Sequence, residues 1–86
     1  MTAEQLLLIA REFCARYQVR VTNFSALAAA AAASTASFEG IPVHDSPRQA
    51  ARALAQVLRG VKALSARNEE FAVFCARVYL SVTEVM

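Results

Sequence analysis

The sequence has no tryptophan, and only two glycines, two prolines and one histidine among its 86 residues. So little glycine and proline excludes collagen-like and turn-rich repeat proteins and favours helices. The sequence also lacks an H-E-x-x-H motif, a Cys/His pair at metal-ligand spacing and a glycine-rich phosphate loop. These absences exclude metal centres and nucleotide sites of the common types, so we expect no cofactor.

Charge and cysteine are scarce as well. Charged residues make up 19% of the chain and the net charge is +2, which alone does not indicate nucleic-acid binding. Cys14 and Cys75 lie in apolar helical patterns, which indicates buried, reduced thiols. The charge-free run 21–38 is too rich in Ala, Ser and Thr to span a bilayer, and residues 1–5 lack the basic segment of a signal peptide. We expect a soluble, cytoplasmic protein.

Apolar residues, in contrast, are abundant at 57%. A chain of this length forms one small domain, which has a large surface relative to its volume. We therefore expect a single helical domain over residues 1–86 that either exposes an apolar face to a partner or belongs to an assembly.

Capping signals and periodicity predict two helices in the first half of the chain. Thr2 and Gln5 fit a capping box that starts the first helix, and the stretch 18–22 should end it. Asn23 is a good N-cap for a second helix, whose alanines 28–33 favour close approach of a neighbouring helix. The predicted core stripe of the first helix is Leu6, Ile9, Ala10, Phe13, Cys14 and Tyr17.

Two further helices are predicted after a short loop or hairpin over residues 38–45. Ser46 and Pro47 mark the start of the third helix. Asn68 is expected to cap the fourth, which is apolar nearly all round from Phe71 to Val82 and therefore suits the middle of a bundle. The predicted buried face of the third helix is Ala50, Leu54, Val57, Leu58, Val61 and Leu64. The expected fold is an all-α, compact bundle of about four main helices.

Basic side chains supply the candidate binding residues. Between residues 48 and 67 there are five basic residues and no acidic ones, and the first four are expected on one arc of a helix. This stripe is either a solvated outer face or a contact for an acidic partner helix or for phosphates. The partner-binding candidates are Arg48, Arg52, Arg59, Lys62 and Arg67.

The order of features along residues 2–80 resembles the death-on-curing (Doc) branch of the Fic/Doc toxin family. The resemblance includes the opening Leu-rich helix, the segment Val21-Thr22-Asn23-Phe24 with the Ala-rich helix after it, and Val43-His44-Asp45-Ser46. It implies a Fic/Doc-like helical core. It also implies that an antitoxin-like helix docks in an apolar groove, as in the toxin–antitoxin modules of this family.

The catalytic motif of that family, H-P-F-x-D-G-N-K-R, falls on residues 62–70 and is degenerate there. Lys62 stands at the catalytic His, Asn68 alone matches, and Glu69 and Glu70 replace the Lys and the phosphate-binding Arg. A protonated lysine is a poor general base, and two carboxylates at a helix N-terminus disfavour phosphate. We expect no catalytic residue and no transfer activity.

The sequence thus predicts a non-catalytic Doc-like domain of a toxin–antitoxin-type system, which binds a protein partner or forms a homo-oligomer. One alternative is an active toxin in which Lys62 or His44 is the base and Arg59 or Arg67 holds phosphate. The other is an unrelated helical nucleic-acid-binding module. It ranks last because no aromatic side chains interleave with the basic stripe and no recognition helix is visible.

Overall fold

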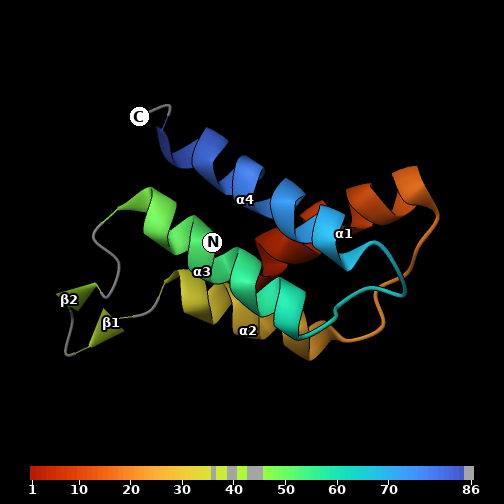
Figure 1. Cartoon of the computed structure of the whole chain (residues 1–86), viewed down its shortest axis with the longest axis horizontal. Helices are drawn as coiled ribbons and strands as arrows, with labels where there is room; N and C mark the ends of the chain where they lie inside the picture. Colours follow the sequence, from red (N-terminus) through yellow and green to blue (C-terminus); the bar gives the residue numbers. More distant parts are fainter. Residues whose placement is uncertain (36, 39–40, 43–45, 85–86) are drawn as a thin grey trace.

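The computed structural model describes residues 1–35, 37–38, 41–42 and 46–84, and these form an all-α bundle of four main helices (Figure 1). The helices are α1 (Ala3–Tyr17), α2 (Phe24–Ser34), α3 (Pro47–Gly60) and α4 (Asn68–Glu84). Between α2 and α3, β1 (Ser37–Phe38) and β2 (Ile41–Pro42) pair antiparallel, with Ser37 opposite Pro42. The predicted all-α bundle, with a hairpin before the third helix, is therefore confirmed.

Capping residues start two of the helices where the sequence predicts. At α1, the Thr2 hydroxyl accepts from the Gln5 N–H at 3.1 Å, and the Thr2 N–H donates to Gln5 Oε1 at 2.8 Å. At α3, the Ser46 hydroxyl accepts from the Gln49 N–H at 3.3 Å. Each bond satisfies a backbone group that has no partner inside the helix. Both predicted helix starts are thus confirmed.

α3 ends earlier than the sequence predicts. Val61 has an extended backbone and is 44% exposed, so it does not belong to the buried face of a helix. The Ala63 carbonyl accepts from the N–H groups of residues 22–23, and Leu64 forms an isolated bridge with Val21. Leu64 is buried, but in this connector and not in α3. Pairing with a distant segment ends the helix, which local periodicity does not reveal.

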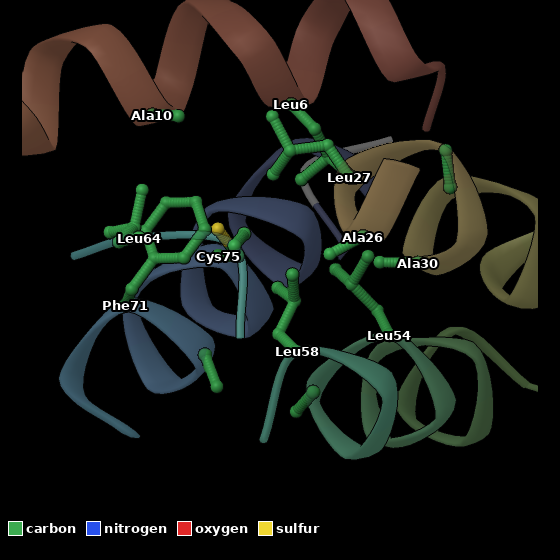
Figure 2. Close-up of a cluster of buried hydrophobic side chains, with 14 of the residues drawn as sticks. Leu6, Ala10, Ala26, Leu27, Ala30, Leu54, Leu58, Leu64, Phe71 and Cys75 are labelled. Atoms are coloured by element: carbon green, nitrogen blue, oxygen red, sulfur yellow. The ribbon is translucent and has the colours of Figure 1, made fainter. Parts of the chain in front are cut away.

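Side chains from all four helices converge on one core (Figure 2). Ala30, in the alanine run, is fully buried, and α2 packs closely on α3, as that run predicts. The largest fully buried side chains are Phe71, Leu6, Leu27, Leu54, Leu58 and Cys75. The core is therefore continuous across the bundle.

α4 lies at the edge of the bundle and not in its middle. α3 packs against both α2 and α4, and in Figure 1 it lies between them. Although α4 is rich in apolar residues, it leaves Val73 39% exposed and Val82 63% exposed. The predicted central position of this helix is wrong, because among the described residues α4 packs against α3 and α1 but not against α2. The described residues therefore leave apolar side chains of α4 uncovered.

Candidate functional site

Residues 62–70, which correspond to the degenerate motif, comprise a hydrogen-bonded connector over residues 62–67 and the first residues of α4. The Ser65 N–H donates to the Arg20 carbonyl at 2.8 Å, and the Arg20 N–H donates to the Ser65 hydroxyl at 3.0 Å. The Asn68 amide accepts from the Leu64 N–H and donates to the Leu64 carbonyl, both at 3.0 Å. The prediction that Asn68 caps the fourth helix is wrong, because it is the first residue of α4 and its side chain holds the preceding turn.

Arg67 contacts one side chain of α4 and one of α1. Its Nη1 lies 3.0 Å from Glu70 Oε2, and its guanidinium carbon lies 4.9 Å from the centre of the Tyr17 ring. Its φ of 59° is left-handed, a conformation that favours glycine. The structure thus gives this partner-binding candidate a role within the chain.

Lys62 and Glu69 do not form a site with each other. Lys62 is exposed in the connector after α3, so the prediction that it continues the helical stripe of Arg48, Arg52 and Arg59 is wrong. Glu69 Oε1 lies 4.0 Å from Arg59 Nε, and the Glu69 side chain is 89% exposed. His44 lies outside the described residues. Within the part of the chain that the structure describes, no three His, Cys, Asp or Glu side chains form a possible metal site.

The other arginines of the stripe line a groove between α3 and α4 with a volume of about 380 Å³. Arg48, Arg52 and Arg59 come from α3, as predicted, and Arg77 comes from α4. Arg77 is not among the residues predicted from the sequence. It is the one charged residue between Phe71 and Val82, and such a residue must leave the core for solvent or a partner. A single charge within an apolar helix therefore indicates a position that faces out of the core. The α3/α4 groove, defined by these arginines and the side chains between them, is the candidate binding site.

No family model, curated protein or solved structure matches the chain. Among the residues that the structure places, no helix combines the length and hydropathy needed to cross a bilayer.

A second groove, between the start of α1 and the end of α4, is mostly apolar. Its volume is about 440 Å³. Leu8 and Val82 at its rim are 62% and 63% exposed. The lining residues are Met1, Gln5, Leu8, Ile9, Val78, Tyr79 and Val82. Apolar surface is thus exposed on both sides of α4, and charge distinguishes the two grooves.

The two cysteines are free, and Cys75 gives the domain a pH dependence. Burial raises the pKa of the Cys75 thiol from 9.0 to about 12. Above pH 9 the unfolded chain therefore loses a proton that the folded chain keeps, and stability falls as pH rises towards 12. Between pH 7 and pH 10 we expect a loss of about 1.4 kcal/mol. Urea unfolding at both pH values should show a smaller loss for Cys75→Ala than for wild type. An identical loss in both proteins would assign the effect to other groups.

Proposed function

We propose that this chain is a non-catalytic, Doc-like helical domain of a toxin–antitoxin-type system, and that it acts by binding another protein. The observation that carries the proposal is the α3/α4 groove, where the partly exposed Val73 lies beside four arginines. Arginine is enriched at protein interfaces, and exposed apolar patches rimmed by polar residues mark interaction sites. The 57% apolar composition, high for a small domain, supports the same function.

The contacts of the motif segment support the non-catalytic part of the proposal. Lys62 stands in the place of the family's catalytic His, and a lysine ammonium donates hydrogen bonds but accepts none. Glu69 and Glu70 occupy the first turn of α4. Their negative charge opposes an incoming phosphate at the positive end of the helix. This segment therefore serves the fold rather than a reaction.

One local feature supports the link to the Doc branch. The family motif has glycine at the position of Arg67, and Arg67 adopts a left-handed backbone, which glycine adopts at least cost. The turn into α4 thus retains a glycine-like conformation although the residue has changed. An antitoxin-like helix, which the resemblance implies as the partner, is compatible with a groove between two helices.

The proposal is tested by site-specific photo-crosslinking in the source cell. A photo-crosslinking amino acid replaces Val73 in the groove, and in the control it replaces Ala29, which is exposed on α2. We expect Val73 alone to give a defined adduct. The partner, identified by mass spectrometry and purified, should then form a stable complex burying about 1,200–2,000 Å². A chain that stays uncrosslinked and monomeric, or that transfers label from a nucleoside triphosphate to a cellular protein, would contradict the proposal.

A further inference from the structure

The α3 wall of the groove carries its charges at helical spacing. Arg48, Arg52 and Arg59 are four and seven residues apart, so they lie on one face of α3 and span about 16 Å. Ala55 lies on the same face between the second and third arginine, and it is buried. The wall is therefore a row of cations about three turns long, with a small residue in the row.

The α4 wall is mixed in character. Arg77 lies between Val73 and Leu80, which precede and follow it by about one turn, and all three line the groove. Ala76, also from α4, completes the lining with the small side chains of α3. Small residues at the contact allow another helix to approach closely. The groove thus offers apolar contacts along α4 and positive charge on both walls.

Most of this positive charge lacks a strong acidic partner among the described residues. No ion pair involves Arg52 or Arg77 there, and both side chains are exposed. Arg59 has only the 4.0 Å contact with the exposed Glu69, and such a pair contributes little. Carboxylates from outside would therefore meet Arg52 and Arg77, which no described side chain neutralises.

Resting on the proposed function, we infer that the occupant of the α3/α4 groove is an acidic amphipathic helix of about three turns from another protein. Its apolar ridge contacts Val73 and Leu80, and carboxylates beside that ridge pair with the arginines of both walls. Electrostatic attraction of this kind also selects the partner.

Charge and shape exclude the other occupants. A second copy of the chain does not provide the helix, because the acids of α1 and of the first turn of α4 form no stripe of matching length. A nucleic-acid backbone would satisfy the arginines but leave Val73 and Leu80 without apolar contacts. An acidic amphipathic helix satisfies both.

The test uses a synthetic 16-residue helical peptide with a leucine ridge flanked by glutamates, and fluorescence anisotropy as the readout. Its controls are a peptide with lysine at every glutamate position and a scrambled peptide of the same composition. We expect the wild-type chain to bind the acidic peptide at least about tenfold more tightly than either control. The double variant Arg52→Glu, Arg77→Glu should lose about tenfold to a hundredfold in affinity, because each reversal replaces attraction by repulsion.

Matched variants separate groove contacts from net charge. Arg11→Glu combined with Arg20→Glu makes the same change in net charge at exposed positions that do not line the groove, and should bind like wild type. The lysine peptide should bind the groove variant more tightly than it binds wild type. Equal losses in both double variants, or no preference for the acidic peptide, would overturn the inference. The inference would also be overturned if a 20-base-pair DNA duplex bound the wild-type chain and the control double variant but not the groove variant. If Val73 still gives its adduct, such a result leaves the proposed function standing.

Discussion

Phe71→Ala is expected to destabilise the domain by about 3–5 kcal/mol, because it removes the largest fully buried side chain of the core. The Phe71 ring lies 5.3 Å from the Phe13 ring, which also contacts Tyr17 and Phe74. The substitution therefore leaves a cavity and also breaks an aromatic cluster that joins α1 to α4. A domain of this length has a total stability of about 4–13 kcal/mol, so the variant should be partly or wholly unfolded at 37 °C. Urea unfolding followed by circular dichroism measures the loss.

Phe24→Ala is the matched control for this substitution. Phe24 is 51% exposed at the start of α2, so the same chemical change should cost less than about 1 kcal/mol. Equal losses at the two positions would mean that the aromatic cluster around Phe13 does not contribute as the packing indicates.

Local signals in the sequence predict the starts of α1 and α3 well. The hydrogen bonds of Thr2 with Gln5 and of Ser46 with Gln49 join residues three apart, so the sequence pattern and the structural contact are the same feature. The end of α1 is also local, since Gln18 takes a left-handed backbone just after the last periodic residue. These helix boundaries depend on residues close together in the chain, so a short sequence pattern can reveal them.

The end of α3 and the place of α4 depend on distant contacts. The bridge between Val21 and Leu64 joins two connectors that no periodicity relates. The composition of α4 indicates burial all round, but the number of available neighbours decides how much of it is covered. The sequence could predict that apolar surface exceeds what the chain can bury, but not which side of which helix stays exposed.

The sequence predicts only one of the two walls of the candidate groove. Arg48, Arg52 and Arg59 follow one helical repeat and can be placed on one face without a structure. Lys62 obeys the same spacing only if the helix continues, and it does not. Arg77 belongs to the groove because α4 packs beside α3, which is a tertiary fact. A stripe on one helix can therefore be predicted, whereas the opposite wall of a groove cannot.

Asn68→Ala is expected to cost about 1–3 kcal/mol, although Asn68 is the one residue that matches the Fic/Doc motif and the variant removes no large side chain. Its amide bonds both backbone groups of Leu64, a residue only 2% exposed. Without that amide, a buried N–H and a buried carbonyl lose their partner, and the cost of desolvating them is no longer offset. Urea unfolding and hydrogen exchange of the Leu64 amide should both report the loss.

Asn23→Ala separates this role from a general effect of replacing asparagine. Asn23 is half-buried at the N-cap of α2 and makes no capping hydrogen bond through its side chain, so its loss should cost under about 0.5 kcal/mol. If both variants lose the same stability, and the Leu64 amide exchanges no faster in Asn68→Ala, then Asn68 does not hold the turn. If the predicted difference is found, the matching motif residue is explained by the fold alone. Its presence then gives no reason to expect catalysis at the start of α4.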